Sequence, residues 1–144
     1  MVAIVAVALA AWALLSKSSP EAPIGAAAEN SQGGDPKKSV CDTFRVVTSA
    51  VSIQTHNDLG PDPIPQAAVA GNARLALLGG GQYLLTSLQS DTPEDLSNSV
   101  RSFANTLQSV GMNALAGVPN SNGEQAARLA SAEQDRKKIA DMCK

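Results

Sequence analysis

Residues 92–114, TPEDLSNSVRSFANTLQSVGMNA, carry the clearest fold signal in the chain. Thr92 is a candidate N-cap, Pro93 takes the first helical position, and two acidic residues follow where they favour the helix dipole. Large apolar residues then recur at spacings of four and three, which places them on one face of a helix. These are Leu96, Val100, Phe103, Leu107 and Val110. The stretch predicts an amphipathic helix that ends near Gly117.

Two more stretches show a helical pattern on either side of this one. Residues 39–56 begin at a candidate N-cap, Ser39, and residues 121–143 open with the capping-box spacing of Ser121 and Glu124. Each stretch then has apolar residues at helical spacing. In the first they are Val40, Phe44, Val47 and Val51, and in the last they are Leu129, Ala132, Ile139 and Cys143.

The segment 65–89 is rich in leucine but contains three successive glycines. A glycine in a helix interior costs about 1 kcal/mol relative to alanine. We expect one continuous helix, in which a neighbour packs closely against the bare backbone at Gly79, Gly80 and Gly81. A kink that divides the segment into two helices is the alternative.

Four helices with short connections predict antiparallel neighbours, and therefore an all-α, up-down four-helix bundle. Cys41 opens the first helix and Cys143 closes the last, so both lie at the same pole of such a bundle. We predict a disulfide between them, with two free or metal-binding thiols as the alternative. A single histidine, His56, does not complete a zinc site with two cysteines.

The N-terminal segment is uninterrupted apolar sequence from residue 2 to residue 15. The run is short for a membrane span, and no positive charge precedes it, so a true start upstream of Met1 would supply what is missing. We expect a retained membrane anchor at residues 1–16, with a cleaved signal peptide as the alternative. Residues 17–38 indicate a flexible Pro/Ala/Gly linker, and residues 39–144 an extracytoplasmic helical domain.

Several kinds of chemistry find no support in the sequence. The net charge of −2 argues against nucleic acid as a partner. No motif indicates an activated nucleophile, so we predict no enzymatic activity and no cofactor. Asp58 and Asp62 flank a glycine, but the prolines between and after them do not fit a calcium loop, and no metal site is predicted.

The chain resembles a group of bacterial envelope proteins in its layout. The apolar segment, the linker, the two cysteines and the stretch NARLALLGGGQYLL at 72–85 are similar to the Ala/Pro-rich single-pass membrane proteins of mycobacteria and related actinobacteria. The resemblance implies a cell envelope with an outer lipid layer and implies no activity. Small secreted mycobacterial haem carriers are also helical with a disulfide, but only Tyr83 and His56 could serve as haem ligands here, without a recognisable motif.

Two functional hypotheses follow from this layout. In the first, the anchored domain binds a partner protein in the cell envelope, for example as an accessory subunit of a membrane complex, because a tether raises the local concentration near membrane partners. Its candidate contacts are Asp58, Asp62, Gly79, Gly80 and Gly81. In the alternative, the domain carries an apolar ligand, a lipid or haem, in a cavity. That cavity would be lined by Leu78, Tyr83, Phe103 and Leu107.

Overall fold

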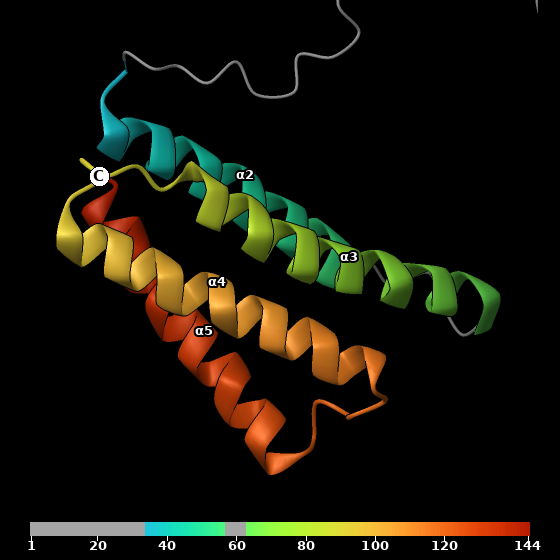
Figure 1. The fold of residues 1–144 in the computed structure, drawn as a ribbon. Coiled ribbons are helices and arrows are strands. Elements are labelled where there is room, and N and C mark those ends of the chain that lie inside the picture. Colours follow the sequence, from blue (N-terminus) through green and yellow to red (C-terminus); the bar gives the residue numbers. More distant parts are fainter. Residues whose placement is uncertain (1–33, 57–62) are drawn as a thin grey trace, which may run out of the picture. The chain divides into compact units, whose positions relative to one another are not determined.

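A computed structural model describes residues 34–56 and 63–144 of the chain. These residues form four helices and no strand, which confirms the predicted all-α bundle for this part of the chain (Figure 1). The helices are α2 (Pro36–Thr55), α3 (Pro63–Ser87), α4 (Glu94–Leu115) and α5 (Gly123–Met142). None of them is both long and apolar enough to cross a membrane. The predicted anchor at residues 1–16 lies outside the described residues.

The start of α2 differs from the predicted one. The helix begins at Pro36, so the last three residues assigned to the linker are helical and Ser39 is not the N-cap. Asp35 caps the helix instead, because its carboxylate accepts a hydrogen bond from the Lys37 backbone N–H at 2.9 Å. Proline at the first helical position needs no partner for an N–H, which makes this start favourable.

The starts of α4 and α5 also differ from the predicted caps. Thr92 does not cap α4: its hydroxyl oxygen accepts a hydrogen bond from the Gln89 N–H at 3.1 Å and so closes the preceding turn. The N-cap position falls on Pro93. At α5 the cap is Asn122, one residue after Ser121, and its side-chain oxygen accepts from the backbone N–H groups of Glu124 and Gln125. At α5 the neighbouring Ser121 and Asn122 have similar capping ability, so a one-residue error there is natural.

Helix α3 continues through its three glycines, as predicted. A Cβ atom at Gly80 would lie 2.8 Å from Cγ1 of Val47 on α2, and one at Gly81 would lie 2.7 Å from the carbonyl oxygen of Ala104 on α4. A Cβ at Gly79 would meet nothing within 4 Å. Two of the three glycines therefore let neighbouring helices approach the backbone of α3.

The core lies between helices that are neighbours in the chain: α2 packs on α3, α3 on α4, and α4 on α5. The predicted stripe of α4 is buried throughout, and Phe103 meets Phe44 of α2 edge to face at 5.8 Å between ring centroids. In α3 the buried leucines are Leu77 and Leu84, whereas Leu75 is 70% exposed. The core has few large side chains, and small residues account for part of its close packing.

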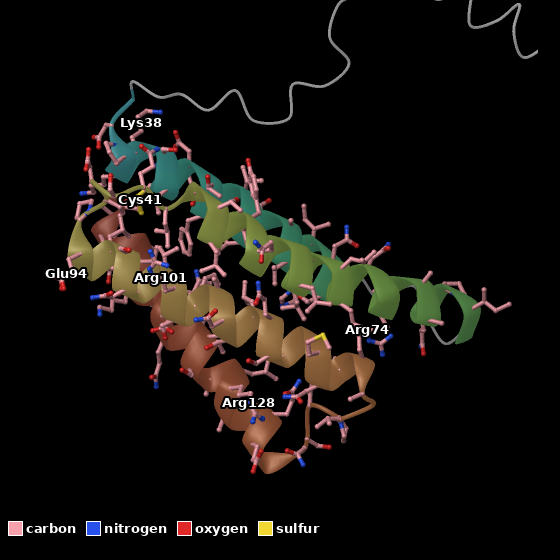
Figure 2. All side chains as sticks on the ribbon, in the orientation of Figure 1. Lys38, Cys41, Arg74, Glu94, Arg101 and Arg128 are labelled. Carbon is pink, nitrogen blue, oxygen red and sulfur yellow. A yellow bond between two sulfur atoms is a disulfide. The ribbon has the colours of Figure 1, made fainter. Side chains whose placement is uncertain are left out.

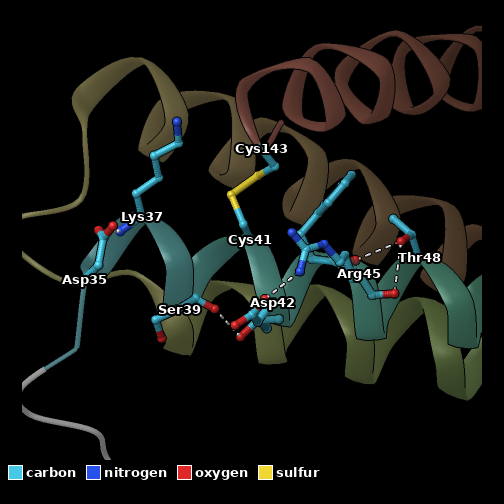
Figure 3. Close-up of a disulfide and its surroundings, with 10 residues drawn as sticks. Asp35, Lys37, Ser39, Cys41, Asp42, Arg45, Thr48 and Cys143 are labelled. Atoms are coloured by element: carbon cyan, nitrogen blue, oxygen red, sulfur yellow. Dashed lines mark hydrogen bonds and ion pairs between the residues drawn. A yellow bond between two sulfur atoms is a disulfide. The ribbon is translucent and has the colours of Figure 1, made fainter.

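A disulfide joins Cys41 to Cys143, as predicted, with their Cα atoms 5.6 Å apart. It links the first turns of α2 to the residue that follows α5 (Figure 3). Because α2 and α5 do not pack extensively on each other, this bond is the principal link between the first and last helices in the described part of the chain.

Candidate functional site: an interhelical groove

A groove of about 1260 Å³ lies among the four helices, and we call it the interhelical groove. Its lining comes from residues 45–55 of α2 with the following His56, 66–77 of α3, 103–114 of α4 and 129–136 of α5, together with the connection at 117–120. Helices α2 and α5 come together at the end that holds the disulfide and lie apart away from it, while α3 and α4 remain packed on each other (Figure 1). The groove occupies the space that this separation leaves.

The floor of the groove is apolar and belongs to the core. Leu77 of α3 and Phe103, Leu107 and Val110 of α4 line it, and each is at least nine-tenths buried. The side chains of both helices are held in place by close packing, since a Cβ at Gly111 of α4 would lie 3.0–3.2 Å from leucine atoms of α3. These floor side chains are therefore covered mainly by the core itself, and an occupant would contact chiefly the partly exposed side chains of the walls.

The walls of the groove consist mainly of small or short side chains. On α2, the hydroxyls of Thr48 and Thr55 donate hydrogen bonds to the carbonyl oxygens of Phe44 and Val51, both at 2.8 Å, within their own helix. These hydroxyl protons therefore require no partner from an occupant. The other walls include Ala70 and Ala73 of α3 and Leu129 and Ala132 of α5.

Charged side chains in the lining are mostly basic. Arg45 binds the carboxylate of Asp42 at 2.7 Å, and Arg136 binds both carboxylate oxygens of Glu133 at 2.7 and 2.8 Å. The hydrogen bond from Arg136, with the nearby charges of Arg136 and Lys137, lowers the pKa of Glu133 from 4.5 to about 2 despite partial desolvation. Both pairs are substantially exposed to solvent.

Arg74 differs from these arginines because it has no hydrogen bond or ion pair within the described part of the chain. It is half-buried in the lining of the groove. Its side chain extends from α3 toward the end of the bundle where α4 terminates (Figure 2). A guanidinium there, without a partner among the described residues, is available to pair with a carboxylate or phosphate of an occupant.

Only two of the four residues predicted to line a ligand cavity lie in the groove. Phe103 and Leu107 lie on the groove floor. Leu78 packs against Gly111 of α4 instead, and Tyr83 is 49% exposed and outside the groove lining. His56 does line the groove, at the end of α2, where its Nδ1 lies 2.9 Å from the Ser52 carbonyl oxygen. Tyr83 and His56 therefore do not face one pocket together.

The residues predicted for partner contact fall into three groups. Asp58 and Asp62 lie outside the described residues. Gly80 and Gly81 are covered by α2 and α4, so their bare backbone serves packing within the chain. Gly79 is exposed on α3. Among the residues that the structure describes, no group of three or more His, Cys, Asp or Glu side chains is placed to hold a metal ion.

Sequence reasoning missed Leu77, Val110 and Arg74 as groove residues. Leu77 lies seven residues before Leu84, but Leu78 and Leu85 have the same spacing, so the sequence held no signal that singled out Leu77. The position of Arg74, three residues before Leu77, depends on the same undetermined register. Comparison of the chain with protein families, curated proteins and solved structures found no match. Functional inference therefore rests on the groove and its chemistry.

Proposed function

We propose that this chain is a membrane-anchored extracytoplasmic module that binds a partner protein of the cell envelope in its interhelical groove. The observation that carries the proposal is the groove itself: about 1260 Å³, with apolar side chains such as Val51, Val69 and Leu129 partly exposed above a buried apolar floor. Covering these exposed side chains with a partner removes them from water and gains free energy. The expected anchor at residues 1–16 would raise the local concentration of the module near membrane partners.

The size and openness of the groove favour a protein over a small molecule. Sites for small ligands measure roughly 300–1,000 Å³ and enclose most of the ligand surface. The interhelical groove is larger, at about 1260 Å³, and it is partly open to solvent. Carriage of a lipid or haem is the second candidate, which the position of Phe103 and Leu107 on the floor supports.

A photo-crosslinking residue in the groove tests the proposal. Full-length protein carrying p-benzoylphenylalanine at Ala73 is expressed in its native membrane, irradiated, and analysed by mass spectrometry. The matched control places the same residue at Ala68, which is exposed on the same helix outside the groove lining. We expect a discrete protein adduct from Ala73 and not from Ala68. An adduct with lipid or haem alone at Ala73 would favour the carrier, and no adduct at all would refute binding in the groove.

A further inference from the structure

Resting on the proposed function, we infer that the occupant of the groove is an amphipathic α-helix of about three turns, with a carboxylate that pairs with Arg74. Three properties of the groove point to this occupant: its length and volume, the chemistry of its floor, and the charge of its lining. Each property can be compared with what a helix, an acyl chain or another segment of this chain would offer.

The dimensions of the groove match a short helix. Along α2 the lining extends from Arg45 to His56, eleven residues apart. At a rise of about 1.5 Å per residue this is about 16 Å, or three turns. A helix about 10 Å across and 16 Å long occupies roughly 1300 Å³. The groove has a volume of about 1260 Å³, which is of the same order, so its size is compatible with one such helix.

The floor and walls suit one face of that helix. Above the buried floor, the partly exposed apolar side chains Val51, Val69 and Leu129 would meet residues at positions i, i+3 or i+4, and i+7 of a helix. The walls contain alanines, and threonines whose hydroxyls donate to carbonyl oxygens of their own helix. These short side chains allow the backbone of a partner helix to approach closely. This is the arrangement of a helix-in-groove complex, in which a few apolar side chains anchor the partner.

The positive charge of the groove lining favours a partner helix with an acidic residue beside its apolar face. The lining holds three arginines and one glutamate, although the whole chain has a net charge of −2. Arg45 and Arg136 already have carboxylate partners, whereas Arg74 has none among the described residues. A carboxylate beside the apolar stripe of the partner would pair with Arg74, and a lysine there would be repelled.

Other occupants satisfy fewer of these conditions. The apolar segment at residues 2–15 of this chain contains no acidic residue that could pair with Arg74. A single acyl chain could cover the floor but has a smaller cross-section than a helix, so it would leave much of the space between the walls to water. An acidic amphipathic helix meets the volume, the floor and the charge together.

The experiment identifies the crosslinked segment and then measures its affinity. The Ala73 adduct is digested and sequenced, and a peptide of that segment is synthesised. Its binding to full-length protein in detergent is followed by fluorescence anisotropy for the wild type, Arg74→Glu and Arg101→Glu. Arg101 is the matched control, because it is exposed on α4, outside the groove, and has no ion pair among the described residues. Circular dichroism checks that both variants keep their helices.

We expect a segment with helical apolar periodicity and a flanking Asp or Glu. Arg74→Glu should weaken its binding by about three- to tenfold at low salt, and less at high salt, whereas Arg101→Glu should change it less than twofold. Replacing the acidic residue of the peptide with lysine should restore binding to Arg74→Glu.

Two kinds of result would overturn the inference, and they are distinguishable. A protein adduct whose segment lacks helical periodicity, or whose binding is unaffected by Arg74→Glu, refutes the acidic helix and leaves the proposed function intact. A lipid adduct, an adduct with residues 2–15, or no adduct at Ala73 refutes the proposed function and the inference together.

Discussion

At the scale of single residues, three successive glycines of α3 have three different surroundings. Gly79 faces open space, Gly80 faces the side chain of Val47, and Gly81 faces the carbonyl oxygen of Ala104. A side chain can rotate away from an added methyl group, but a backbone carbonyl within a helix cannot. The cost of adding a Cβ should therefore rise from the first glycine to the third.

Alanine at these positions gives a graded prediction for stability. Gly79→Ala should raise the free energy of unfolding by about 0.5–1 kcal/mol, since alanine favours helix and meets no obstacle. Gly81→Ala should lower it by about 1–3 kcal/mol, because a Cβ 2.7 Å from the Ala104 oxygen forces the helices apart. Urea denaturation followed by circular dichroism measures both. Equal effects of the two substitutions would contradict the close α3–α4 contact.

The lowered pKa of Glu133 predicts how the stability of the fold depends on pH. Its pKa is lowered from 4.5 to about 2, chiefly by the hydrogen bond from Arg136. A carboxyl with a lower pKa in the folded state stabilises the fold above about pH 4.5, and this contribution is lost as the pH falls toward 2. The effect should be modest because the side chain is 47% exposed. An NMR titration should show the low pKa, and Arg136→Gln should move the pKa back toward 4.5; no movement would exclude Arg136 as its cause.

At the scale of elements, α5 packs extensively on one described neighbour, α4. Its buried residues are Gln125, Ala132 and Ile139. Gln125 is completely buried, and its Nε2 donates to the carbonyl oxygen of Val110 at 3.1 Å while its Oε1 accepts from Asn113 at 3.3 Å. These hydrogen bonds fasten the first turn of α5 to α4 far from the disulfide, beside the groove floor.

Removing that side chain should loosen the start of α5. Gln125→Ala leaves the buried Val110 carbonyl oxygen without this donor and opens a cavity, so we expect a loss of about 1–3 kcal/mol in unfolding free energy. Hydrogen exchange should accelerate first in the N-terminal half of α5. Gln134→Ala, at an exposed position of the same helix, is the control and should change stability by less than about 0.5 kcal/mol. Similar effects at both positions would argue against the buried hydrogen bonds as the cause.

Helices with one apolar stripe were predictable from the sequence, whereas the inward face of α3 was not. In α4 every residue of the stripe from Leu96 to Val110 is buried, because one face alone is apolar. In α3 apolar residues occur on all sides, so periodicity could not distinguish the buried Leu77 from the exposed Leu75. The choice depends on where α2 and α4 approach the glycines, which is a property of the assembled bundle.

At the scale of the whole described unit, the groove could not be derived from the sequence. The sequence places Phe103 and Leu107 in a candidate ligand cavity, and both lie on the groove floor. The width of the groove, however, depends on the separation of α2 and α5. That separation depends on the angle at which α2 and α5 cross. Because these two helices share few contacts, no local sequence pattern determines the angle. The sequence did predict the one covalent constraint on it, the bond between Cys41 and Cys143.

Loss of the disulfide should therefore affect the bundle unevenly. The bond closes a sequence separation of 102 residues, so its removal in Cys41→Ser/Cys143→Ser should lower the unfolding free energy by about 2–5 kcal/mol. Under native conditions, hydrogen exchange should accelerate mostly in the disulfide-bonded ends of α2 and α5. The α3–α4 pair should remain protected, because its contacts at Gly81 and Gly111 do not depend on the bond.

Reduced wild-type protein is the matched comparison for that variant, because it lacks the same bond without a change of sequence. The two should show the same pattern of exchange and the same denaturation midpoint. If the disulfide also sets the width of the groove, both should bind the peptide captured at Ala73 more weakly than the oxidised protein, since the walls at α2 and α5 are no longer held together. Uniform acceleration across all four helices would instead indicate that the bond stabilises only against global unfolding, and that packing alone positions α2 and α5.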